Sequence, residues 1–515
     1  MECDLAHPLL SSYVLPTKTN NLKKPTWRSN EMSTRKHNVP YLIFICAIAS
    51  VSGIILGYDA SVISGVIDPL TEHLSLSPAE SGWAVSNVIL GCVIGAWGVG
   101  RLTDRIGRKS TLIITAILFA ISAIGAALAN DLTWFVVYRL IGGLAVGMAS
   151  AVTPLYIAEV SPKDLRGRML GMQQMLMVSG QLVVYVVNYL IAKGAAHEWI
   201  VSMGWRWMLA SALVPCVLFL IMACFMPESP RWYAMHNKKE KALKVLTSLS
   251  NAAHAERLYS AIRGSIAADS ASNDGQPQRG ILKDKKASYI LWIGCAIAVL
   301  QQVSGINILM YFAPSLLQNV TGNTQDSLFQ SIFLGLALLA GVSIALVAFD
   351  RVGRIPLLRW GALGCAAFLF FTSWAFMNEA KGYLPVVGLV GFIFVFGLSW
   401  SLGAWLLISE IFPNRMRAVA MGYAFCSLWV SNFIVTQSFP MMNRSPVLME
   451  HFNGAFPLLL CGGFSVIAFW FVGRFLPETK GVSLEHIEPL MLSKSRRFGH
   501  EQPLITPESV SQSKP

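Results

Sequence analysis

Charged side chains are scarce in this chain of 515 residues, where they make up 13% of the total. Soluble proteins average roughly 25% charged residues. Hydrophobic residues reach 54% and form repeated runs near the ~20 residues that a helix needs to cross a bilayer. This composition excludes a soluble domain and predicts an all-α protein that crosses a membrane many times.

Residues that build metal and catalytic sites are also few and dispersed. The nine cysteines show no metal-ligand or redox spacing, so we expect them to be small core residues. All nine histidines fall in predicted tails or loops, and no nucleophile–base set lies within an apolar run. The sequence therefore predicts no metal site, no cofactor and no enzymatic activity.

The apolar runs predict twelve membrane spans, at 40–66, 81–102, 109–129, 132–157, 169–192, 206–226, 288–312, 328–349, 356–376, 384–408, 418–439 and 454–476. Of the 40 Lys and Arg residues, 35 lie in segments on one side of this arrangement. Because positive charge favours the cytoplasmic side, both termini are expected there. The net charge of +12 then reflects topology and not a nucleic-acid partner.

One long polar interruption divides the spans six and six, and within it residues 238–265 predict short amphipathic helices. The expected organisation is a cytoplasmic N-terminal tail, a six-helix bundle, a cytoplasmic linker, a second six-helix bundle and a cytoplasmic C-terminal tail. Their predicted boundaries are 1–39, 40–226, 227–287, 288–476 and 477–515.

Three motifs occur once in each half of the chain. Asp-Arg-x-Gly-Arg begins at Asp104 and at Asp350. A Glu seven residues before an Arg is found at Glu159 and at Glu410. Pro-Glu is found at 227–228 and at 477–478, and the offsets between the copies are 246, 251 and 250 residues. Such self-similarity indicates a duplicated six-span unit, with two parallel halves around a central site at the membrane midplane.

The charged residues of these motifs all fall on the predicted cytoplasmic side. Carboxylate–guanidinium pairs there are expected to form a gate that latches the two halves together; the alternative is a solvated surface. The predicted gate residues are Asp104, Arg105, Arg108, Glu159, Arg166, Glu228, Asp350, Arg351, Arg354, Glu410 and Arg417.

One carboxylate, Asp59, lies inside the first apolar run. A charge at membrane depth costs about 2.5–3.5 kcal/mol on insertion scales, so it normally faces a cavity and has a partner. Arg139 in the fourth span lies at a similar depth, roughly 8–10 Å below the outer surface at 1.5 Å per residue. We expect the two to pair, either as a proton-linked pair or as a static one.

Neutral polar side chains gather on the fifth and seventh spans, and tryptophans on the tenth and eleventh. Amides suit vicinal hydroxyls, and an indole suits the C–H face of a sugar ring; the alternative is packing between helices. The residues are Gln174, Gln181, Gln301, Gln302, Asn307, Tyr311, Trp400, Trp405 and Trp429.

The combined motifs resemble the sugar porter family of the major facilitator superfamily. The motifs that carry this resemblance are Gly100 to Lys109, Arg139 to Gly147, Pro154 to Glu159, Pro227 to Arg231, Gln301 to Asn307, Ser409 to Pro413 and Pro477 to Gly481. The run Gly57-Tyr58-Asp59 resembles the bacterial xylose– and galactose–proton symporters of this family.

The resemblance implies a sugar pocket and a proton-coupling pair. The pair is Asp59 and Arg139. The implied substrate-binding residues are Gln174, Gln181, Gln301, Gln302, Asn307, Tyr311, Trp405 and Trp429.

Some positions depart from the family pattern. Ser401-Leu402 replaces a Gly-Pro in the tenth span, so the helix break there is expected to be weakened or shifted to Gly403. Leu338 and Leu428 stand where amides are usual, which predicts a pocket wall with fewer polar contacts.

The predicted function is import of a monosaccharide coupled to protons by alternating access, in a multi-pass protein of the plasma membrane, the inner membrane in bacteria. The expected partners are a small neutral sugar or polyol, protons and lipid, and the expected state is a monomer. Alternatives are a uniporter of the same fold for a sugar or polyol, and a sugar sensor that does not transport.

Overall fold

The computed structural model describes residues 38–273, 284–321, 323–380, 383–412, 416–479 and 487–494. Within these ranges, twelve helical segments are long and apolar enough to cross a membrane. The twelve predicted spans are therefore confirmed. Most of the helices extend beyond the apolar runs by several residues, because polar turns at their ends continue the same helix.

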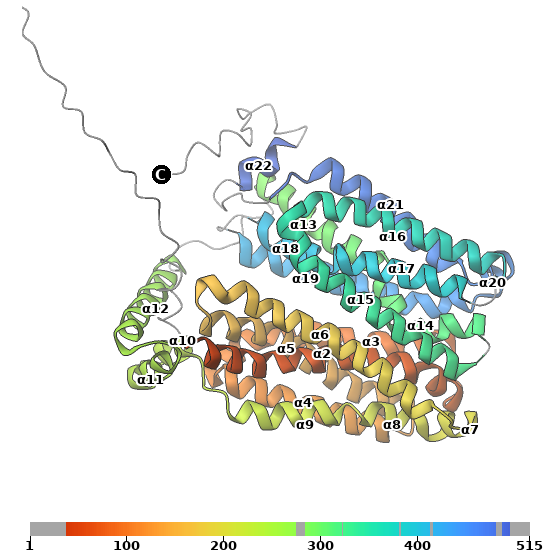
Figure 1. Ribbon diagram of the computed structural model, residues 1–515, viewed down its shortest axis with the longest axis horizontal. Helices are drawn as coiled ribbons and strands as arrows, with labels where there is room; N and C mark the ends of the chain where they lie inside the picture. Colours follow the sequence, from red (N-terminus) through yellow and green to blue (C-terminus); the bar gives the residue numbers. More distant parts are fainter. Residues whose placement is uncertain are drawn as a thin grey trace, which may run out of the picture.

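The N-terminal half forms one bundle of helices, shown in red to yellow-green in Figure 1. Its sixth span is interrupted by a short π-helix. The elements are α2 (Val39–His73), α3 (Pro78–Ile106), α4 (Arg108–Leu128), α5 (Leu132–Val160), α6 (Lys163–Ala192), α7 (His197–Trp199), η1 (Ile200–Gly204), α8 (Trp205–Ala210) and α9 (Leu213–Cys224).

The C-terminal half forms a second bundle beside the first (Figure 1). Two of its spans consist of two helices each, α13 with α14 and α17 with α18. The elements are α13 (Lys285–Val303), α14 (Ile306–Thr321), α15 (Thr324–Val352), α16 (Arg354–Met377), α17 (Leu384–Leu398), α18 (Trp400–Ile411), α19 (Arg417–Asn443), α20 (Pro446–Phe452), α21 (Phe456–Phe475) and α22 (Ile487–Ser493).

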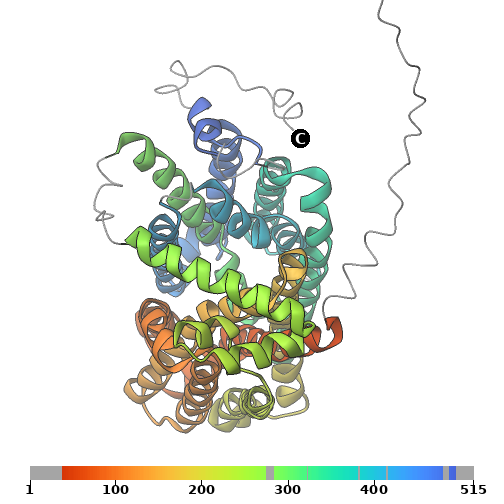
Figure 2. The same ribbon diagram turned by 90° about the vertical axis from the view of Figure 1, so that its left-hand side faces the viewer.

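Short helices lie at one end of the two bundles, which we call the linker end; the opposite end is the far end. They are α10 (Pro230–Met235), α11 (Lys239–Leu249) and α12 (Ala252–Asn273). In Figure 2, which looks at this end, α11 and α12 cross the face of the molecule, and α11 packs on α2. The backbone N–H of Asn38 donates to the Leu249 carbonyl at 2.9 Å, so the start of the described chain is fixed to the linker helices.

The breaks in the seventh and tenth spans have distinct local causes. Gly305 separates α13 from α14 with a φ of 93°, a conformation that glycine adopts without a steric penalty. The tenth span breaks at Ser399, which has φ −122° and ψ −72°. The prediction of a break shifted to Gly403 is wrong: Gly403 lies within α18, and its Cα packs closely against the ring of Phe349.

Glycines allow the helices of the N-terminal half to approach closely. A Cβ on Gly57 of α2 would lie 1.9 Å from the carbonyl oxygen of Met177 in α6, and one on Gly180 of α6 would lie 2.2 Å from that of Ile54 in α2. In α5, a Cβ on Gly143 would lie 2.0 Å from the carbonyl oxygen of Val88 in α3. These seams fix α2 against α6 and α3 against α5.

We predict that Gly143→Ala destabilises the protein, because its methyl group displaces the α3 backbone from the seam. Overpacking of this kind costs typically 1–3 kcal/mol. The matched control is Gly463→Ala, since no atom lies within 4 Å of the added Cβ there. Thermal unfolding of the purified protein in detergent checks this, and an equal melting temperature for the two variants would contradict it.

Candidate functional site

The two intramembrane ions predicted to pair are in contact. Arg139 Nη1 on α5 donates to Asp59 Oδ1 on α2 at 2.8 Å, and the two side chains are 2% and 12% exposed. Arg139 Nε is buried and has no partner among the described residues. The pair therefore rests on one charged hydrogen bond, which makes it separable without the loss of a bidentate contact.

The surroundings of Asp59 are tightly packed. A Cβ on Gly142, one turn after Arg139, would lie 3.9 Å from Asp59 Oδ1 and 2.4 Å from Ser122 Oγ on α4. The Gly57 seam places the Gln181 backbone nitrogen of α6 within 3.1 Å of the same kind of added Cβ on α2. The helix that carries the proton-site candidate and a helix with candidate sugar ligands are thus in direct contact.

Three of the predicted sugar-binding amides gather where α13 meets α14. Asn307 Nδ2 donates to Gln302 Oε1, and Gln301 Nε2 donates to the Trp400 carbonyl at 3.4 Å. Gln301 Oε1 is buried without a partner among the described residues. A buried acceptor of this kind is costly unless something donates to it, so this corner is suited to a ligand hydroxyl.

The remaining predicted ligands come from three other elements. On α6, Gln174 is partly buried and Gln181 is buried. Tyr311 on α14 is buried. Trp405 on α18 is 40% exposed, with its ring 5.2 Å from that of Phe425 on α19, and Trp429 on α19 is partly buried.

The two leucines that replace family amides are both buried. The carbonyl oxygen of Leu338 and its side chain lie 3.1 and 3.2 Å from a Cβ added to Gly397, so Leu338 packs between α15 and α17. It fills a helix seam within the C-terminal half.

A charged cluster occupies the linker end of the N-terminal half. Both Arg108 Nε and Nη2 donate to the Glu159 carboxylate at 3.0 Å, and Nη1 contacts Asp104 at 3.0 Å. Ser229 Oγ also donates to Glu159, at 2.5 Å. Glu228 accepts from the backbone N–H groups of α4, including that of Arg108 at 2.8 Å, and so caps the positive end of that helix.

The C-terminal half repeats this cluster in a looser form. Arg354 Nη2 lies 3.3 Å from Glu410, Arg354 Nη1 lies 3.7 Å from Asp350, and Thr479 Oγ1 donates to Glu410 at 2.7 Å. Glu478 accepts from the backbone N–H groups of Arg354 and residue 355 at 3.0 Å and caps α16. The duplication inferred from the motifs is therefore visible in the side-chain contacts.

The arginine that binds Glu159 is Arg108, and not Arg166, which lies seven residues after Glu159 in the motif. Glu159 binds Arg108 because the close packing of α4 on α5 brings that guanidinium to it, whereas Arg166 and Arg105 are exposed. Arg351 lies at the end of α15, and the side chain of Arg417 is outside the described part of the chain. The four ion pairs of these clusters each lie within one half, so a latch between the halves stays a prediction.

Several residues of interest escaped the sequence reasoning. Ser229, Thr479 and Glu478 complete the clusters described above. At the far end, Asp68 on α2 accepts a 2.6 Å hydrogen bond from Ser315 on α14. Asp68 lies just beyond the predicted first span, so it was not considered a membrane carboxylate; the helix that continues to His73 was the missing signal.

Comparisons with known proteins agree with the geometry. The family model of sugar (and other) transporters matches residues 45–491. The D-xylose-proton symporter of Escherichia coli strain K12 is 34% identical over 488 residues, covering 90% of this chain and 98% of its own length. The arabinose-proton symporter of Bacillus subtilis strain 168 is 35% identical over 460 residues, covering 89% and 97%.

A solved structure is similar as well. The inward open conformation of the xylose transporter XylE from E. coli superposes with a TM-score of 0.77 at 33% identity, covering 87% of this chain and 100% of that one.

We predict that Glu159→Ala destabilises the protein more than Glu410→Ala. Arg108 and Glu159 are 4% and 5% exposed, whereas Arg354 and Glu410 are 14% and 24% exposed. Removal of one member of a buried pair costs about 3–5 kcal/mol because the other charge is left uncompensated, and exposure reduces this cost. Thermal unfolding in detergent checks the order, and the two variants are matched because each carboxylate also binds one hydroxyl.

Proposed function

The chain belongs to the family of sugar (and other) transporters, and from this premise we propose that it imports a monosaccharide together with protons. It is a transporter with the major facilitator fold, and it crosses the membrane twelve times. The proposed substrate is a pentose or hexose. The related symporters for D-xylose and arabinose support this class.

The observation that carries the proposal is the buried Asp59–Arg139 pair, whose carboxylate is on α2, the helix that packs against α6. A carboxylate at this depth is stabilised by its guanidinium partner. Protonation of Asp59 removes its charge, weakens the 2.8 Å contact and frees Arg139. The pair has no counterpart in the C-terminal half, where positions 309 and 390 hold Leu and Val. Because the fold of that half forms without such a pair, the pair in the N-terminal half is suited to a specific function.

The sugar itself is proposed to bind at the midplane between the halves. Gln174, Gln181, Gln301, Gln302 and Asn307 supply amide donors and acceptors for its hydroxyls. Tyr311, Trp405 and Trp429 supply the aromatic walls. Gln301 Oε1, which has no partner in the described part of the chain, marks where a hydroxyl would donate.

In alternating access, the far end and the linker end of the molecule are closed in turn. In this structure the far end is closed: Ser86 on α3 donates to Gln437 Oε1 on α19 at 2.6 Å, and Tyr185 on α6 donates to the Met310 carbonyl on α14 at 2.9 Å. We propose that the far end faces outward and that the linker end, with both termini, faces the cytoplasm of a plasma-membrane protein. The ion-pair clusters would latch the halves in the opposite, outward-open state, and the working unit is proposed to be a monomer.

We predict that Asp59→Asn abolishes uphill uptake and sugar-driven alkalinisation, because an amide cannot take up and release the proton. Exchange of labelled for unlabelled sugar should continue, since the sugar ligands are unchanged. A pH electrode and labelled D-xylose in proteoliposomes measure both. Asp326→Asn, at an exposed position in the first turn of α15, is the control that keeps coupling, and alkalinisation that survives Asp59→Asn would reject the proposal.

We predict that Gln302→Ala raises KM for sugar about tenfold, which corresponds to ~1.4 kcal/mol. The substitution removes the acceptor of the Asn307 amide as well as a ligand. The number of protons moved per sugar should not change, because Asp59 is untouched. A change in that ratio would mean that Gln302 belongs to the coupling machinery.

We predict that Gly82→Val prevents closure of the far end. A Cβ on Gly82 would lie 2.6 Å from the Gln437 carbonyl oxygen across the interface, whereas one on Gly100 of the same helix meets no atom within 4 Å. Uptake should fall at least tenfold while the purified protein still binds sugar, and Gly100→Val should retain uptake. Full transport by the Gly82 variant would contradict the closure that we describe.

A further inference from the structure

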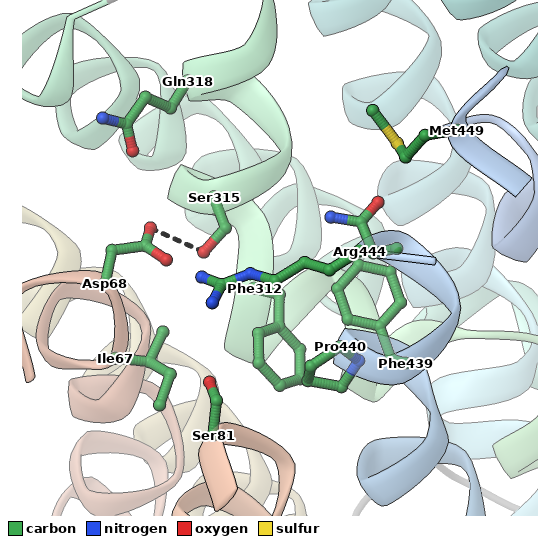
Figure 3. Close-up of a pocket in the computed structure, with 11 residues that line it drawn as sticks. Ile67, Asp68, Ser81, Phe312, Ser315, Gln318, Phe439, Pro440, Arg444 and Met449 are labelled. Atoms are coloured by element: carbon green, nitrogen blue, oxygen red, sulfur yellow. Dashed lines mark hydrogen bonds between the residues drawn. The ribbon is translucent and has the colours of Figure 1, made fainter. Parts of the chain in front are cut away.

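We propose that the far end holds a second sugar site, separate from the midplane site and formed only when that end is closed. This inference rests on the proposed function for the identity of its ligand. It starts from a cavity of about 270 Å³ between the halves, drawn in Figure 3. A second cavity of about 320 Å³ adjoins it and shares Asp68, Gln318 and Arg444.

The first cavity is lined from both halves of the molecule. Asp68 comes from α2, Ser315 and Gln318 from α14, and Arg444 directly follows α19. In Figure 3 the carboxylate of Asp68 and the guanidinium of Arg444 point toward one another across the cavity, with Phe312 and Phe439 below them. Asp68 lies nine residues beyond Asp59 on the same helix, which is about 13–14 Å at 1.5 Å per residue.

The polar groups around the cavity are not fully used by the protein. Ser315 donates to one carboxylate oxygen of Asp68, Oδ2, at 2.6 Å. Asn443 also lines the cavity, and its Oδ1 is buried without a partner among the described residues. A buried acceptor left unpaired costs about 1–3 kcal/mol, so a hydrogen-bond donor that reached this oxygen would relieve the cost.

The charges favour a neutral ligand. The Asp68 carboxylate and the Arg444 guanidinium offset one another, and in the adjoining cavity Glu72 pairs with His197 at 3.1 Å. An anion would therefore be repelled by the Asp68 carboxylate, and a cation by the Arg444 guanidinium. Carboxylate acceptors, guanidinium donors and a floor of two phenyl rings, whose centroids lie 4.8 Å apart, match the hydroxyls and C–H face of a sugar.

Size favours a monosaccharide. Sites for small molecules enclose ~300–1,000 Å³, and the cavity, at about 270 Å³, is slightly smaller than the lower end of this range. The cavity therefore accommodates a pentose and is too small for an oligosaccharide.

A sugar in this site would touch both halves and hold the far end closed. Binding of this sugar disfavours the outward-open state, because opening of the far end separates α2 from α14 and α19. The expected consequence is inhibition of uptake by external sugar at high concentration, while sugar at low concentration is carried through the midplane site.

The test is the binding of labelled D-xylose to the purified full-length chain by equilibrium dialysis. Wild type should bind two molecules per chain at saturation, and Arg444→Ala should bind one. Gln302→Ala should weaken the tighter midplane site about tenfold and leave the affinity of the second site unchanged. In proteoliposomes, uptake by wild type should pass through a maximum as external D-xylose rises, and uptake by Arg444→Ala should reach a plateau.

Ser315→Ala separates a sugar site from a contact that only closes the far end. It removes one of the hydrogen bonds between the halves, that from Ser315 to Asp68, and leaves Asp68, Asn443 and Arg444 in place. Two molecules bound by Ser315→Ala and one by Arg444→Ala support the site. One molecule bound by wild type, or two by Arg444→Ala, overturns it. Either of these results alongside intact sugar-driven alkalinisation would reject this inference and leave proton-coupled import standing.

Discussion

The structure depends on a single constraint, which is that a carboxylate buried in a membrane must have a partner. Asp59 meets this constraint through one guanidinium on another helix, Arg139. That contact requires α2 and α5 to lie side by side at matching depth, and the glycine seams allow the approach of the flanking helices. The helix that carries Asp59 also packs against α6, which carries Gln174 and Gln181.

Much of this arrangement could be predicted from the sequence. The apolar runs gave all twelve spans, the duplicated motifs indicated two equal halves, and the depth of Asp59 and Arg139 indicated their pairing. These features follow from hydropathy and helix geometry, which act locally. The partner of Glu159 could not be found in this way, because a motif places Arg166 nearby in sequence, while the packing of α4 on α5 brings Arg108 nearer in space. The break at Ser399 and the carboxylate of Asp68 were missed for a related reason, since both depend on where a helix ends.

The two halves contain the same charged cluster at the linker end, but the two copies differ in burial and in contact distances. In each half an arginine binds a glutamate that also accepts from a hydroxyl, and a second glutamate caps the next helix. The N-terminal copy is almost fully buried and its arginine binds the glutamate through two nitrogens. The C-terminal copy is more exposed and its contacts are longer. The half with the tighter copy is also the one that holds the intramembrane ion pair.

The glycine seam between α2 and α6 has a mechanical consequence. The backbones of the two helices are in contact at Gly57 and Gly180. The helices therefore cannot slide along one another without moving apart. We therefore expect a displacement of α2 at Asp59 to move α6, with Gln174 and Gln181, as a rigid body, without a series of side-chain rearrangements between them. Tight coupling of this kind limits slippage, in which the proton gradient dissipates without driving the uptake of sugar.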